Sequence, residues 1–155
     1  MSHDPEIYTF LTRHLQAIMD NDIEAYHTTT SANLTLYEWW VTPHRIDGLP
    51  FHDFMMTENE RRGAVFGSEA EQAGDTKKLP ARFDLANLHI QRYGDTAIAS
   101  YTLLLSTGLA DGVKVASHNE SRVMVKLEGG WQVVHVHKSP AWPAPAASVQ
   151  ATAHD

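Results

Sequence analysis

The sequence predicts a single α+β domain in which helices come first and a long, strongly bent antiparallel sheet follows. Up to about residue 60, apolar residues recur mostly every three or four positions, which is typical of helices packed by one face. From about residue 80 they alternate along long segments separated by glycine-containing turns, which is typical of strands. The length of 155 residues is the usual size of one domain, and the absence of cysteine excludes disulfides.

The first predicted helix begins at Pro5, because Asp4 is a good capping residue and proline is favoured at the first helical position. Asn21 ends this helix, and Asp22 caps a shorter one that continues through Tyr26. The stripe that the first helix turns toward the core comprises Ile7, Phe10, Leu11, His14, Leu15 and Ile18.

A strand and a third helix are predicted next. Residues 33–39 alternate and are rich in strand-forming types. A helix follows Gly48 and Pro50, and its apolar stripe is expected to include Phe51, Phe54, Met55 and Glu58. Glycines and lysines between residues 63 and 80 predict a loop or a ragged extension of this helix.

The remaining elements are predicted strands. Residues 82–93 form the first, with a bulge expected where the apolar phase slips between Leu85 and Leu88. Turns at residues 94–95, 111–112 and 129–130 separate three more strands, at 97–105, 113–128 and 131–138. The domain is therefore expected to span residues 1–143, followed by a flexible alanine- and proline-rich tail at 144–155. A long sheet bent around helices makes a cone with a hollow mouth, which is a natural pocket.

The formal net charge of −7 disfavours nucleic acid and membrane surfaces as partners. The N-terminus lacks the pattern of a signal peptide, and no apolar run approaches the ~18 residues of a membrane span. We therefore expect a cytoplasmic protein, and the sequence implies no cofactor.

Four segments occur in the order found in one known family. They are NLTLYEWW, IDGLPFHDF, NLHIQRYGDTAIASY and SHNESRVMVKLEGGWQVVHVHKSPAWPAP. Across residues 5–143 the chain resembles the association (hub) domain of calcium/calmodulin-dependent protein kinase II, a member of the nuclear transport factor 2-like superfamily. That superfamily also contains SnoaL-like cyclases, ketosteroid isomerases and scytalone dehydratases.

The resemblance implies a cone-shaped nuclear transport factor 2-like fold and a homo-oligomer, either a dimer or a larger ring. It does not imply kinase activity, because the chain contains no glycine-rich phosphate loop. It also contains no basic amphipathic helix of the kind that binds calmodulin. We expect the open faces of the sheet to make the contacts, with Val133, His135 and His137 contributing.

The family hub also has a pocket, lined by arginines and a histidine, that can take a small carboxylate. Arg122 and His52 match two of these positions, and Lys138 stands at a third. A further family arginine falls near Leu103 and is lost, and the loop at 63–80 is longer than the family's by about a dozen residues. The resemblance to the family's pocket implies a small organic acid as ligand.

The candidate ligand-binding residues centre on Arg122 and Glu120, which lie two apart on a strand and so share one face. They form either an ion pair at the pocket floor, where Arg122 grips a carboxylate, or a structural salt bridge. The full candidate set is Arg122, His52, Glu120, Tyr37, Tyr101 and Lys138.

Two alternatives remain open. The first is a small-molecule enzyme, a SnoaL-like cyclase, isomerase or dehydratase, in which Glu38 or His52 would move a proton. If the protein is not an enzyme, we expect Glu38 to pair with a cation and His52 to form a hydrogen bond within the fold. We favour a non-enzymatic domain. His135 and His137 have a spacing seen in some metal sites, and His89, His118 or Glu120 could add a third ligand. We expect packing or interface roles for this pair and no metal.

Overall fold

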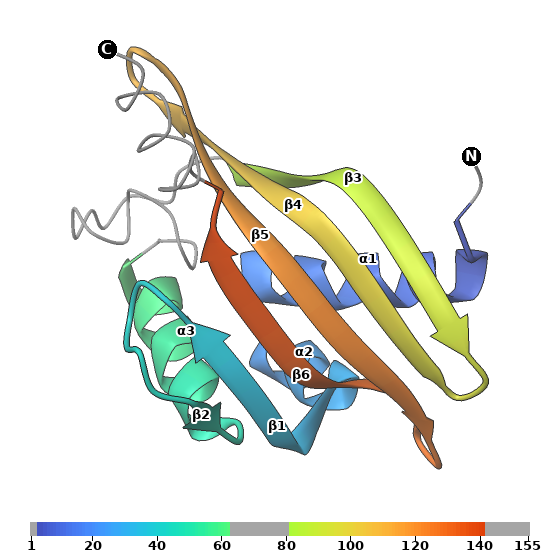
Figure 1. Ribbon diagram of the computed structural model, residues 1–155. Helices are drawn as coiled ribbons and strands as arrows, with labels where there is room; N and C mark the ends of the chain where they lie inside the picture. Colours follow the sequence, from blue (N-terminus) through green and yellow to red (C-terminus); the bar gives the residue numbers. More distant parts are fainter. Residues whose placement is uncertain (1–2, 63–80, 142–155) are drawn as a thin grey trace, which may run out of the picture.

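The computed structural model describes residues 3–62 and 81–141. The predicted loop at 63–80 and the predicted tail at 144–155 lie outside the described residues. Figure 1 shows three helices and six strands: α1 (Pro5–Met19), α2 (Ile23–Thr29), β1 (Thr30–Glu38), β2 (Ile46–Asp47), α3 (Pro50–Arg62), β3 (Ala81–Tyr93), β4 (Thr96–Leu109), β5 (Gly112–Leu127) and β6 (Gly130–Pro140). Only the two-residue strand β2 was not predicted.

The six strands form one sheet in the order β2-β1-β6-β5-β4-β3. Strands β3 to β6 are consecutive hairpins, as predicted, and their pairings are antiparallel. The predicted sheet is antiparallel throughout, but β1 runs parallel to β6, so the sheet is mixed. This pairing joins segments about 100 residues apart, and such contacts leave no local signal in the sequence.

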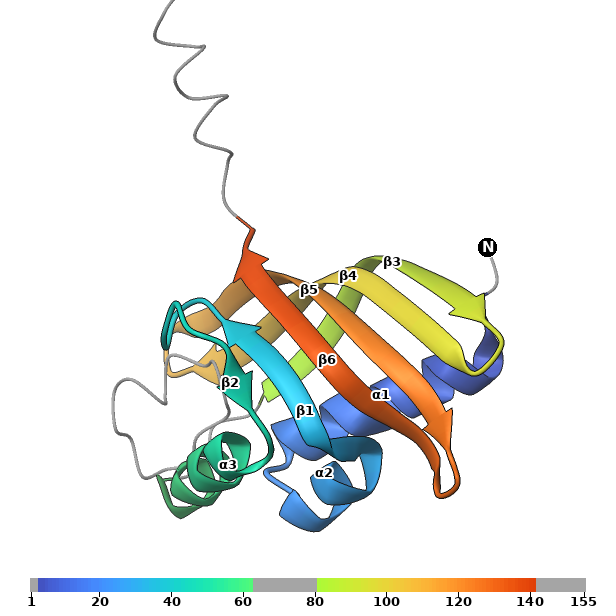
Figure 2. The ribbon, with the colours of Figure 1, turned by 60° about the horizontal axis from the view of Figure 1, so that its bottom comes forward.

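The helices lie against one face of the sheet, which bends over α1 (Figure 2). The capping by Asp4 is confirmed, because its carboxylate accepts hydrogen bonds from the backbone N–H groups of Glu6 and Ile7. The predicted stripe of α1 is buried and packs with inward-facing residues of the strands. No helix within the described residues covers the opposite face of the sheet, which we call the outer face.

The predicted bulge lies in β3, where the pairing with β4 shifts between Ala86 and His89. Asn87 takes a φ of 55° there, a conformation that asparagine tolerates better than most residues. The extra residue restores the inward phase, so that Phe83 and Leu85 before the bulge and Leu88 after it all pack against the core.

The predicted stripe of α3 is wrong in part. Phe51 and Met55 do pack against the core. The residues that α3 buries are His52, Met56 and Asn59, however, and Phe54 is 64% exposed. Two of the three inward-facing residues are polar, so an apolar pattern could not reveal the buried face of this helix.

In the part of the chain that the structure describes, no helix is long and apolar enough to cross a membrane.

Candidate functional site

Four polar side chains lie directly opposite one another on neighbouring strands of the helix-covered face. Glu38 of β1 pairs in register with Lys138 of β6, Lys138 with Glu120 of β5, and Glu120 with Tyr101 of β4. All four are buried. We call this line of residues the inner row. Because it alternates acid, base and acid, each buried charge has an opposite charge beside it.

Arg122 completes this group from the next inward position on β5. Its Nη1 donates to the hydroxyl oxygen of Tyr101 at 2.6 Å and to the carboxylate of Glu120. The Tyr101 hydroxyl in turn donates to Glu120 Oε1 at 2.8 Å. The ion pair between Arg122 and Glu120 predicted from their spacing is therefore present, with Tyr101 as a third member.

The charges around Glu120 keep it ionised. Burial alone raises the pKa of this carboxyl, but the charges of Arg122 and Lys138 and two hydrogen bonds outweigh burial and hold the pKa below its ordinary value. Burial also raises the pKa of Tyr101 well above its ordinary value, so the hydroxyl remains a proton donor. A carboxylate in this state is a partner for a cation rather than a proton acceptor near neutral pH.

The second buried acid, Glu38, is also paired. Its Oε2 lies 2.6 Å from Nζ of Lys138, and both side chains are at least 92% buried, with exposures of 0% and 8%. The two buried acids and two buried bases therefore balance in charge.

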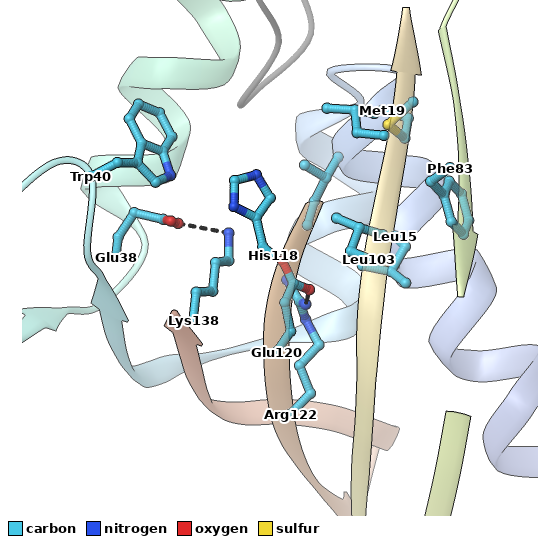
Figure 3. A pocket seen from close by; sticks show the side chains of 12 residues that line it. Leu15, Met19, Glu38, Trp40, Phe83, Leu103, His118, Glu120, Arg122 and Lys138 are labelled. Carbon is cyan, nitrogen blue, oxygen red and sulfur yellow. Dashed lines mark hydrogen bonds and ion pairs between the residues drawn. The ribbon is translucent and has the colours of Figure 1, made fainter. Parts of the chain in front are cut away.

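Glu38, Glu120 and Lys138 of the inner row line a cavity of about 40 Å³ (Figure 3). Tyr101 is not among its lining residues. Since a water molecule needs at least about 10–15 Å³ of such space, the cavity admits roughly three waters or a group of similar size. One wall is apolar and the other is charged. The lining comprises Leu15, Ile18, Met19, Glu38, Trp40, Phe83, Leu103, Leu105, His118, Glu120, Arg122 and Lys138.

His118 is a cavity residue that the sequence analysis considered only as a possible metal ligand. It lies two positions before Glu120 on β5, and this period-two spacing was the signal that could have found it. Figure 3 shows its ring between the Glu38–Lys138 pair and the apolar wall. Burial lowers the pKa of His118 despite the opposing effect of the nearby Glu120 charge.

The position where the family arginine is lost also faces the cavity. Leu103 lines it from β4 and pairs in register with His118 on β5. An apolar side chain and a half-buried imidazole thus occupy this part of the wall. Among the described residues, Arg122 and Lys138 are the two cations that border the cavity.

His52, a predicted ligand-binding residue, is not among the residues that line the cavity; it contacts Tyr26 instead. The Tyr26 hydroxyl is 2.6 Å from His52 Nδ1, and the Tyr26 ring stacks at 5.7 Å on the ring of His14. His14 Nδ1 is 2.9 Å from the Thr29 hydroxyl. Burial, reinforced by the positive charges of Arg122 and Lys138, holds the pKa of both histidines well below its ordinary value.

The protein is therefore expected to lose stability in mild acid. His14 and His52 remain neutral in the folded state at a pH where the unfolded chain protonates them. Their contribution is complete above about pH 6.5 and is lost as the pH falls below it, by at most about 1.4 kcal/mol per pH unit for each histidine. Urea unfolding between pH 8 and pH 5 measures this slope. His52→Gln should reduce it and the exposed His44→Gln should not, whereas a flat profile would contradict the expectation.

Tyr37 does not join the cavity group, because neighbours in a strand point to opposite faces and Glu38 points inward. Tyr37 is 37% exposed on the outer face, where its ring centre lies 5.1 Å from that of His137. His135 lies on the same face, with Nδ1 2.7 Å from the Thr35 hydroxyl. No group of three residues placed to hold a metal ion occurs within residues 3–62 and 81–141.

The sequence analysis grouped Val133 with His135 and His137 on an open face of the sheet, but Val133 does not share their face. It is fully buried in the core. The pairing of β5 with β6 shifts between Val123 and Met124, and this irregularity changes the alternation of β6 between Val133 and His135.

Helices on one face of a bent mixed sheet, with a cavity between the two layers, define a nuclear transport factor 2-like protein. A nuclear transport factor 2-like superfamily protein from Salmonella enterica has this fold, with a TM-score of 0.63 at 21% identity, over 91% of this chain and 93% of that chain. Residues 3–142 match the family described as calcium/calmodulin dependent protein kinase II association domain. The chain belongs to this family.

Individual relatives agree with this assignment. The S. rosetta CaMKII hub has a TM-score of 0.68 at 26% identity, over 91% of this chain and 100% of that chain. The delta subunit of calcium/calmodulin-dependent protein kinase type II from Oryctolagus cuniculus is 27% identical over 136 residues, which make up 86% of this chain. The chain spans 23% of the length of that kinase subunit.

Proposed function

We propose that this chain is a self-associating hub-type domain whose internal cavity binds a small carboxylate. The family assignment supports self-association. The buried Arg122 guanidinium at the cavity supports the ligand class, and it is the observation that carries this part of the proposal.

The distribution of charge on the sheet supports association through the outer face. Strands β1, β4, β5 and β6 contain six charged residues, and all of them follow the alternation of the helix-covered face: Glu38, Lys114, Glu120, Arg122, Lys126 and Lys138. Their outer-facing positions carry no acid and no lysine or arginine. In a chain of net charge −7, this is the broad surface where two copies meet without repulsion.

Light scattering after size-exclusion chromatography tests the assembly. We expect a mass of at least two chains at micromolar concentration and pH 8. A strict monomer under these conditions would exclude self-association as the function.

The state of the two buried acids supports binding over proton transfer. Glu38 contacts Lys138, and Glu120 contacts Arg122 and Tyr101, so each carboxylate already has a cationic partner inside the domain. Arg122 Nε is buried and has no hydrogen-bond partner within the described residues. This leaves guanidinium donor capacity for an added carboxylate.

A thermal-shift experiment tests the ligand class. Because a ligand that binds only the folded state stabilises it, acetate, which is small enough for the cavity, should raise the melting temperature with increasing concentration. Acetamide, which has the same shape without the charge, should not. Arg122→Lys should weaken the response, whereas the outer-face variant His137→Gln should retain it. Equal shifts from the acid and the amide would contradict a carboxylate site.

A further inference from the structure

The outer face of the sheet carries a continuous line of uncharged polar residues. Tyr37 of β1 pairs in register with His137 of β6, His137 with Ser121 of β5, Ser121 with Ser100 of β4, and Ser100 with His89 of β3. We call this line the outer row. A shallow groove of about 550 Å³ follows it from His89 to His137. His135 adds a third imidazole beside the row, packed 6.4 Å from the Tyr37 ring.

We propose that two copies of this chain meet through the outer row, and that the contact holds only while His89, His135 and His137 are neutral. This inference rests on the self-association proposed above and specifies its surface and its control. Self-association of a small domain most often follows a two-fold axis, so the same row faces itself across the contact. The three imidazoles of each copy are then brought close to the three of the other.

Histidine is the side chain that gains a proton between pH 8 and pH 5. Protonation would place like charges on both sides of one desolvated contact, and like charges facing each other across an interface oppose association strongly. The neutral residues of the outer row supply no carboxylate to offset them.

The side chains that face the three histidines from the neighbouring strands are uncharged. His137 faces the Tyr37 ring and Ser121, and His135 faces the Thr35 hydroxyl and Val123. His89 faces Ser100.

Within the described residues, carboxylate groups reach this face only at its margins. Glu120 borders the groove, but its carboxylate is bound by Arg122 on the helix-covered side. Asp47 of β2 lies beyond Thr35 and is held by Arg45 at 2.7 Å, and Asp84 of β3 is held by Arg82 at 3.0 Å. Each already has a cation, so neither is available to neutralise the imidazolium charges at the centre of the face.

The experiment is light scattering on the whole chain from pH 8 to pH 6, with circular dichroism at each pH to confirm that the fold is retained. The wild type should associate at pH 8, and its dissociation constant should rise at least about tenfold by pH 6, because each repulsive charge pair that costs 1.4 kcal/mol changes affinity by that factor. The triple variant His89→Gln, His135→Gln, His137→Gln should associate equally at both pH values. His44→Gln, in the connection between β1 and β2, should behave as the wild type.

The outcomes separate the two proposals. A monomer at pH 8 would overturn self-association itself. Association with an unchanged dissociation constant down to pH 6, or a triple variant that dissociates in acid as the wild type does, would overturn the histidine control alone.

A second variant tests the surface independently of pH: Ser121→Arg places a permanent charge in the outer row and should be monomeric throughout. If Ser121→Arg associates normally, the outer row is not the contact.

Discussion

Replacing Arg122 by methionine is expected to lower the free energy of unfolding by about 3–5 kcal/mol. The substitution retains much of the apolar volume but removes the cation from Glu120, whose side chain is 2% exposed. The carboxylate would then keep one hydrogen bond, from Tyr101, and the more distant charge of Lys138. Urea unfolding at pH 7 measures the loss.

A double variant separates the charge from the packing. Glu120→Gln combined with Arg122→Met removes both charges, so much of the lost stability should return. Arg92→Met is the matched surface control, because Arg92 pairs with Asp4 and Glu6 near solvent, where ion pairs contribute little. If Arg122→Met costs no more than Arg92→Met, the buried pair does not have the energetic role assigned to it.

The second large effect is expected for Lys138→Met, again about 3–5 kcal/mol. Lys138 lies between Glu38 and Glu120 in the inner row, so its loss removes a neighbouring positive charge from two buried acids at once. Glu38 is affected more, because the contact at 2.6 Å with Lys138 is its ion pair. Denaturant unfolding again gives the magnitude.

Glu38→Gln in the background of Lys138→Met should recover a large part of this loss, whereas Glu24→Gln on the exposed side of α2 should recover none. A double variant as unstable as Lys138→Met would mean that Lys138 acts through packing of its aliphatic chain and not through its charge.

The sequence predicted the elements that depend on local signals. Asp4 and Asp22 cap their helices through their own side chains, and glycines occupy the positive-φ positions of the hairpin turns. The bulge near Asn87 was visible as a slip in the apolar phase. Arg122 and Glu120 could be placed on one face because a strand has a period of two, and this face is the buried one.

What the sequence could not predict depends on contacts between distant segments. The parallel pairing of β1 with β6 brings Glu38 to Lys138, and nothing near either residue indicates its partner. The buried side of α3 is set by the contact of His52 with Tyr26, a polar contact that an apolar pattern misses. Tyr37 was grouped with the pocket through its neighbour Glu38, although consecutive strand residues face opposite ways.

The inner and outer rows belong to consecutive residues of the same strands, and this protects β1 and β6 against misalignment. If β6 slid by one residue, Lys138 would turn to the outer face and His137 to the interior, and the Glu38 carboxylate would be stranded among apolar groups. Every off-by-one arrangement therefore carries a heavy electrostatic penalty. The buried charges thus specify the register in which β1 and β6 pair. Alternating valines and histidines alone would allow several registers.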